Sequence, residues 1–142
     1  MADVGATRER VQRMLTQMVG PVQVDSEGDF SLRQGSARVF VRVTPAFEDH
    51  TVVRVFAYTN QQVPASPELF HFVATTHSFV FGNLLAVEFE DGVTVIFAQT
   101  ILGDTLDPDE LFTAVVAVAM TADEIDDVIQ ERFGGNRFHE DD

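Results

Sequence analysis

The sequence predicts an α+β domain in which an antiparallel sheet of about five strands packs against three helices. Apolar residues recur at helical spacing in three segments, and they alternate with polar residues in most of the others. The connections between the strand segments are short, which favours antiparallel neighbours. The predicted order is α-β-β-β-α-β-β-α, with one additional short strand after the first helix.

The first helix is expected over residues 8–19. Thr7 is the expected N-cap because its hydroxyl can accept a bond from the first helical turn. Gly20-Pro21 is expected to end the helix. One face of the helix carries the apolar side chains Val11, Met14, Leu15, Met18 and Val19.

Strands are expected next, at residues 22–24, 30–32, 37–43 and 51–59, where apolar side chains alternate with polar ones. Pro45 is expected to end the third of these strands, because proline has no N–H to donate to a sheet ladder. Turn-forming residues separate the segments, so consecutive strands are predicted to pair.

The middle of the chain predicts a crossover, a helix and a hairpin. Residues 60–65 are expected to form a polar crossover, and Ser66 is a good N-cap for the second helix. Asp91-Gly92 lies between the apolar runs of residues 84–90 and 93–102, which is a strong signal for a tight hairpin.

The last helix has the clearest signals at both ends. Asp107 and Glu110 form a capping box, and Gly134-Gly135 is expected to end the helix about 25 residues later. Residues 1–135 are therefore predicted to be one domain, and residues 136–142 a flexible acidic tail. The predicted apolar stripe comprises Leu111, Phe112, Val115, Val116, Ala119, Ala122, Ile125, Val128, Ile129 and Phe133.

Charge is distributed unevenly along the chain. The net charge is −14, which opposes binding to nucleic acid and to anionic membranes. Residues 1–60 contain seven arginines and seven acidic residues, whereas residues 61–142 contain sixteen acidic residues and two arginines. The acidic half could serve solubility alone, or the asymmetry could steer self-association or attract a cationic peptide.

The residues that usually carry chemistry are scarce or scattered. The chain has no cysteine, which excludes disulfides and thiolate metal ligands. We expect no enzymatic activity, no metal and no cofactor, since no pair of histidines has the spacing of a zinc site and no phosphate loop or nucleophile elbow is present. The four histidines are His50, His71, His77 and His139.

The chain is expected to be cytoplasmic. Its first residues are polar, unlike a secretory signal. The longest apolar stretch, residues 112–120, is far shorter than the ~20 residues that cross a bilayer.

Splitting each strand by alternation predicts two apolar sheet faces. One face is assigned to the core and includes Leu85, Val87 and Phe89 in the hairpin, which leaves Leu84, Ala86 and Glu88 on the other. On this other face the third helix could cover the apolar groups, or they could form a binding surface for a partner, since aromatic residues and arginine are enriched at interfaces. The candidate partner-binding residues are Arg38, Phe40, Arg42, Arg54, Phe56, Tyr58 and Ile96.

Three segments resemble a known family. Residues 64–69 before the middle helix, residues 102–111 entering the last helix and residues 123–135 leaving it look like the bacterial YbjN group, which is similar in fold to type III secretion chaperones (TY-Chap domain). The resemblance implies a secretion-chaperone-like sandwich that is commonly dimeric and has peptide-binding or regulatory roles. It implies no catalytic residue.

The sequence therefore predicts a non-enzymatic, chaperone-like binding module. We expect a homodimer that binds an unknown peptide or protein client through its sheet face. The alternative is a regulatory domain that senses a small molecule in a pocket between the sheet and the helices. An enzyme with an unfamiliar site would instead need a buried carboxylate or histidine in a cleft.

Overall fold

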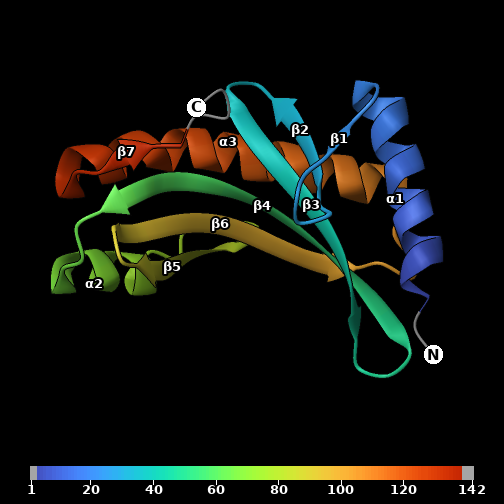
Figure 1. Ribbon diagram of the computed structural model, residues 1–142, viewed down its shortest axis with the longest axis horizontal. Helices are drawn as coiled ribbons and strands as arrows, with labels where there is room; N and C mark the ends of the chain where they lie inside the picture. Colours follow the sequence, from blue (N-terminus) through green and yellow to red (C-terminus); the bar gives the residue numbers. More distant parts are fainter. Residues whose placement is uncertain (1–2, 139–142) are drawn as a thin grey trace.

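The computed structural model describes residues 3–138 and confirms the α+β class with three helices and an antiparallel sheet (Figure 1). The strand order is β1-β2-β3-β4-β6-β5, and β7 pairs with β4. The sheet has seven strands where about five were expected: β1 is the additional short strand predicted at residues 22–24, and β7 was not predicted. The elements are α1 (Val4–Val19), β1 (Gln23–Val24), β2 (Phe30–Gln34), β3 (Ala37–Ala46), β4 (His50–Val63), α2 (Pro67–Thr75), β5 (Asn83–Phe89), β6 (Gly92–Leu102), α3 (Pro108–Phe133) and β7 (Asn136–Arg137).

All three helices pack on one face of the sheet. Val11 of α1, Leu69 of α2 and Leu111 of α3 belong to one buried core together with the inward side chains of β2–β6. Figure 1 shows α1 and α2 at opposite ends of the curved sheet, with α3 extending between them. At about 1.5 Å per residue α3 is ~39 Å long, which lets it span the sheet. The third helix therefore packs on the same face of the sheet as the other two, and in the described chain it does not cover the opposite face.

The N-terminus of α1 differs from the prediction. Asp3 is the N-cap and accepts a bond from the amide of Ala6 at 2.9 Å, so the helix begins at Val4. Thr7 is wrong as an N-cap, because it is buried and its hydroxyl is bonded to that of Thr51 in β4 at 2.9 Å.

A polar network fastens this end of α1 to the sheet. Asp104, just after β6, accepts the amide and hydroxyl of Thr51 at 2.9 Å and contacts Nδ1 of His50 at 2.5 Å. The hydrogen bond with His50, followed by those from Thr51, lowers the pKa of Asp104 to about 2. Arg10 of α1 donates to the carbonyl of Gly103 at 3.0 Å. The start of β4, the end of β6 and α1 are thereby joined.

Strand boundaries depend on neighbours that local sequence does not reveal. Pro45 lies inside β3, opposite Thr51, and does not end the strand. The pairing of β2 with β3 stops at Val41, so one edge of β3 is free there and tolerates proline. The polar crossover expected from residue 60 is also wrong at its start, because β6 and β7 both pair with the far end of β4 and extend it to Val63.

The β5–β6 hairpin has a different register from the predicted one. Phe89 pairs with Gly92, so the two loop residues are Glu90 and Asp91 instead of Asp91-Gly92. A shift of one residue moves every side chain of a strand to the opposite face. Leu84 and Ala86 therefore face the core, whereas the side chains on the opposite face are those of Leu85, Val87 and Phe89.

The predicted caps of the other two helices are confirmed. Ser66 accepts the amide of Leu69 at 3.1 Å, and Asp107 and Glu110 form a reciprocal capping box with bonds of 2.8 and 3.2 Å. Gly134 ends α3 as expected. Two members of the predicted stripe remain exposed: Phe112 and Val128 are 43% and 38% exposed.

Replacing Gly103 with alanine should destabilise the junction between α1 and the sheet. An added Cβ would lie 2.6 Å from Oγ1 of Thr51 and 3.0 Å from Cγ2 of Thr7. Overpacking of this kind costs about 1–3 kcal/mol, which urea unfolding would measure. The matched control is Gly5→Ala in the first turn of α1, where the nearest atom is 3.6 Å away and alanine favours the helix. Equal stability of the two variants would contradict this account of the junction.

Candidate interaction surface on the second sheet face

The face of the sheet opposite the helices, called here the second face, carries its own apolar cluster. Cross-strand pairing brings its members together, since Phe56 lies opposite both Phe40 of β3 and Ala98 of β6. Tyr58 lies opposite Ile96 in the same way. The second-face cluster consists of Phe40, Phe56, Tyr58, Leu85, Ile96, Ala98 and Phe138.

Aromatic rings form the centre of this cluster. The rings of Phe40 and Phe56 are stacked with centroids 5.4 Å apart, and Tyr58 meets both edge-on at 5.3 and 5.9 Å. Offset and edge-on arrangements are the favourable ones for aromatic quadrupoles. The packing explains why Phe40 and Phe56 are only 8% and 4% exposed although no helix of the described chain contributes to the cluster.

The outer part of the second face is more accessible. Tyr58, Ile96 and Leu85 are half-buried, and the apolar surface continues along the edge strand β5. Val87 is 38% exposed and Phe89 is 59% exposed. The cluster therefore has a packed centre and an exposed apolar rim, which is the form of a surface that can accept a partner.

The three arginines of the second face have different environments. Arg42 forms a bidentate ion pair with Asp29 at 2.8 and 2.7 Å, and its guanidinium lies 5.2 Å from the centroid of Phe56. The hydrogen bond with Asp29 raises the pKa of Arg42. Arg38 donates to the hydroxyl of Ser31 at 2.6 Å. Arg54 lies beside Arg42 in the ladder and makes no ion pair within residues 3–138.

Four of the predicted site residues, Phe40, Phe56, Tyr58 and Ile96, do come together in the cluster, and Arg42 packs against it. Sequence reasoning missed further members, because Leu85 and Val87 were assigned to the core by the wrong hairpin register. It also missed Phe138, although the paired glycines after α3 signal a turn that could return the chain to the sheet. The additional residues are Asp29, Leu85, Val87, Phe89 and Phe138.

A small polar cavity of about 160 Å³ borders the cluster where β3 begins and β7 ends. Asp126 of α3 lines it, and burial, followed by the neighbouring charge of Asp127, raises the pKa of Asp126 to about 6. Arg38 and Arg137 also line the cavity, and within the described chain the buried Nε of each has no hydrogen-bond partner.

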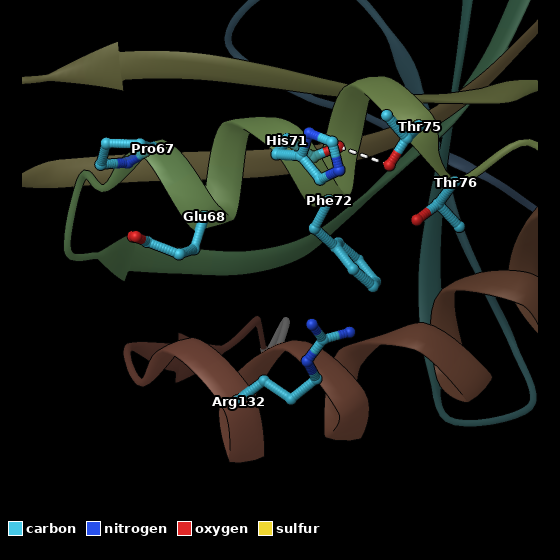
Figure 2. A pocket seen from close by; sticks show the side chains of 7 residues that line it. All are labelled: Pro67, Glu68, His71, Phe72, Thr75, Thr76 and Arg132. Atoms are coloured by element: carbon cyan, nitrogen blue, oxygen red, sulfur yellow. Dashed lines mark hydrogen bonds between the residues drawn. The ribbon is translucent and has the colours of Figure 1, made fainter.

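A larger cleft of about 680 Å³ lies between α2 and the end of α3 (Figure 2). Figure 2 shows Phe72 of α2 and Arg132 of α3 facing each other across it. The guanidinium of Arg132 is 4.9 Å from the centroid of Phe72, a cation–π distance. His71, Thr75 and Thr76 provide further polar groups along the wall. This cleft lies between two helices. Smaller pockets of about 380 and 390 Å³ lie between β5 and α2 and between β6 and α3, which is where the alternative function predicted a ligand.

Among residues 3–138, the hydrogen-bonded groups around Asp104 do not have the order of an acid–base relay. Asp104 lies between His50 and Thr51, whereas activation of a hydroxyl requires the imidazole in the middle position. In the described part of the chain no three His, Asp or Glu side chains are grouped as metal ligands. His139 lies outside the described residues. Among residues 3–138, none of the helices has the length and apolarity to cross a bilayer.

The described residues form an α+β domain with three helices and an open antiparallel sheet. A sequence profile of the family described as "T3SS (YopN, CesT) and YbjN peptide-binding chaperone 1", TY-Chap1, matches residues 6–141. The match covers almost the whole chain, so the protein belongs to the TY-Chap1 family. The family description supports a chaperone-like, protein-binding role and suggests a non-enzymatic one. A search of curated proteins found no match.

Replacing Asp126 with asparagine should change how stability depends on pH. Because the pKa of Asp126 is raised from 3.8 to about 6, its carboxyl is protonated in the folded chain but ionised in the unfolded chain between these two pH values. The free energy of unfolding therefore falls as pH rises through this window, and the penalty is complete above pH 6. The variant should be more stable by about 1 kcal/mol at neutral pH, a value reduced for solvent screening.

Urea unfolding across this pH window would test the effect. The control is Glu124→Gln, which removes an exposed carboxylate from the same helix and should leave the contribution of Asp126 in place. The charged groups near Asp126 are Asp123, Asp127, Arg137 and, across the cavity, Arg38, and all four are kept in both variants. Identical pH profiles for Asp126→Asn and the parent chain would show that the carboxyl is not penalised by burial.

Proposed function

We propose that this protein is a homodimeric, chaperone-like module that binds an extended segment of a peptide or protein client on the second face of its sheet. The observation that carries the proposal is the second-face cluster, which has a packed aromatic centre, an exposed apolar rim and no helix above it within the described residues. Burying one large apolar side chain is worth about 1.5–3 kcal/mol, so a few such contacts sustain an interface.

The arginines of the second face indicate where a charged group of the client would bind. Arg42 is neutralised by Asp29 and stabilises the surface itself. Arg54 lies directly opposite Arg42 in the pairing of β3 with β4. It has no ion pair in residues 3–138, so it is available to a carboxylate of the client. We therefore expect the client segment to combine apolar or aromatic side chains with an acidic group.

Self-association is supported by the resemblance to commonly dimeric chaperones and by the uneven charge. The first 60 residues are electrically neutral and contain seven arginines, whereas the remaining residues carry the whole net charge. Contact between the arginines of one copy and the acidic half of another would be attractive at low salt.

Val87 and Val128 allow a matched test of the second face. Both are valines that are 38% exposed, but Val87 lies on β5 in the second face and Val128 on α3. A peptide would be selected from a displayed random library on the parent protein, and its affinity for each variant measured by calorimetry. Val87→Ser should weaken binding about tenfold through the loss of ~1.4 kcal/mol, while Val128→Ser should not. Equal affinities, or a loss with Val128→Ser alone, would move the client site elsewhere.

Light scattering over a range of concentration and salt would test self-association. A particle of twice the mass of one chain that dissociates as salt rises is the expected result, because salt screens the attraction between exposed charges. A mass of one chain at every concentration and salt would remove the dimer from the proposal.

A second candidate function is favoured by the α2–α3 cleft. Arg132 against Phe72 could hold the carboxylate of a small molecule, as a regulatory sensor would require. A metabolite that raises the melting temperature of the parent chain but not of Arg132→Ala would favour this function over client binding, because only a pocket ligand stabilises the fold through that residue.

A further inference from the structure

The segment that follows α3 returns to the sheet and joins it. Gly134 and Gly135 adopt φ values of 86° and 76°, which turn the chain sharply after the helix. Asn136 and Arg137 then pair antiparallel with Gln61 and Asn60 of β4. A Cβ on Gly135 would lie 2.8 Å from Cα of Val63 and 2.9 Å from the carbonyl oxygen of Gln61, so only glycine fits here without displacement.

This segment occupies a part of β4 that β3 leaves free. The pairing of β3 with β4 runs from Ala46 to Phe40, which lies opposite Phe56. Beyond this point β7 takes the same side of β4, and the amide of Phe138 donates to the carbonyl of Thr59 at 3.0 Å. The C-terminal segment is thus an added strand in line with β3.

The segment also places an aromatic ring on the second face. The centroid of Phe138 is 5.2 Å from that of Tyr58 and 6.5 Å from that of Phe40, which makes Phe138 a member of the second-face cluster. Main-chain pairing with a sheet edge and a side chain in an apolar site is the general mode by which extended peptides bind sheets. The chain therefore already holds a peptide-like segment on the surface proposed for the client.

The side-chain polar contacts that hold this segment lie near the solvent. Arg137 pairs with Asp127 at 2.6 Å, and Asn136 donates to Gln62 at 2.7 Å, in both cases at exposed positions where ion pairs and hydrogen bonds contribute little. The strand is two residues long. The Nε atom of Arg137 is buried without a hydrogen-bond partner in the described chain, which further weakens the docking of the segment. An interaction of this size is one that a longer client segment could replace.

We propose that Asn136–Phe138 is an intramolecular competitor for the client site. In this proposal, which rests on the proposed function, the client is an extended segment that pairs with β4 around Thr59–Gln61 and carries an aromatic side chain. That side chain takes the place of Phe138 beside Tyr58, so client binding requires the release of the chain's own C-terminal segment.

Tyr58 provides a direct reporter for the test. It is the only tyrosine, and the chain has no tryptophan, so the intrinsic fluorescence comes from the cluster alone. The probe is a synthetic peptide with the sequence of residues 134–142, which contains neither tyrosine nor tryptophan. Two full-length variants release the segment in different ways: Phe138→Ala removes the ring, and Gly135→Ala introduces the clash with Val63 and Gln61. The control is Phe112→Ala, which removes an exposed phenylalanine from α3.

Both release variants should make Tyr58 more accessible to acrylamide quenching than it is in the parent chain or in Phe112→Ala. They should also bind the probe peptide at least about tenfold more tightly than the parent, as expected if the segment is docked about nine-tenths of the time. A probe with alanine in place of Phe138 should bind to none of the proteins. Equal probe affinity for the parent and both release variants would overturn the proposal, as would unfolding of both variants, which would assign the segment to the core.

The outcome for the client peptide separates this inference from the proposed function. A library-selected peptide that depends on Val87 but binds the parent chain and Phe138→Ala equally would keep the proposed function and reject the competitor. If Val87→Ser leaves the affinity for the selected peptide unchanged, the proposed function itself is rejected. The probe peptide would then report on the C-terminal segment alone.

Discussion

The alternation of side chains along β4 is the constraint on which the rest of the molecule depends. This central strand pairs with β3 on one side and β6 on the other, so its orientation fixes theirs. Val53 and Val55 point to the helices and are fully buried, while Phe56 and Tyr58 point the opposite way with Phe40 and Ile96 beside them. Because the same strand must supply both faces, the helical core and the second-face cluster are set by a single register.

The second face needs no helix packed on it because its own side chains bury one another. Rings of Phe40 and Phe56 stack, Arg42 lies over Phe56, and Asp29 holds Arg42 in that position with two short hydrogen bonds. The ion pair keeps a cation at an apolar surface without leaving its charge unpaired.

Membership in the TY-Chap1 family supports a chaperone-like, protein-binding role, and the second-face cluster is the surface on which we propose that binding occurs. Extended peptides commonly bind to strand edges; β5 lies at the edge of the sheet, and the far end of β4 has a side that β3 leaves unpaired. The C-terminal segment uses the second of these edges. The predicted flexible tail of residues 136–142 thus begins with three residues that contact the sheet, and residues 139–142 lie outside the described residues.

The sequence by itself determined the features that depend on neighbours in the chain. The caps at Ser66 and Asp107, the end of α3 at Gly134 and the existence of a second apolar face all follow from local hydrogen bonding and alternation. Tertiary structure decided the hairpin register that moved Leu85 and Val87, the burial of Thr7 against Thr51 and the return of Phe138 to Tyr58. Each of these is a contact between residues distant in sequence or a choice between two registers of similar local energy, and only the packing of the whole sheet distinguishes them.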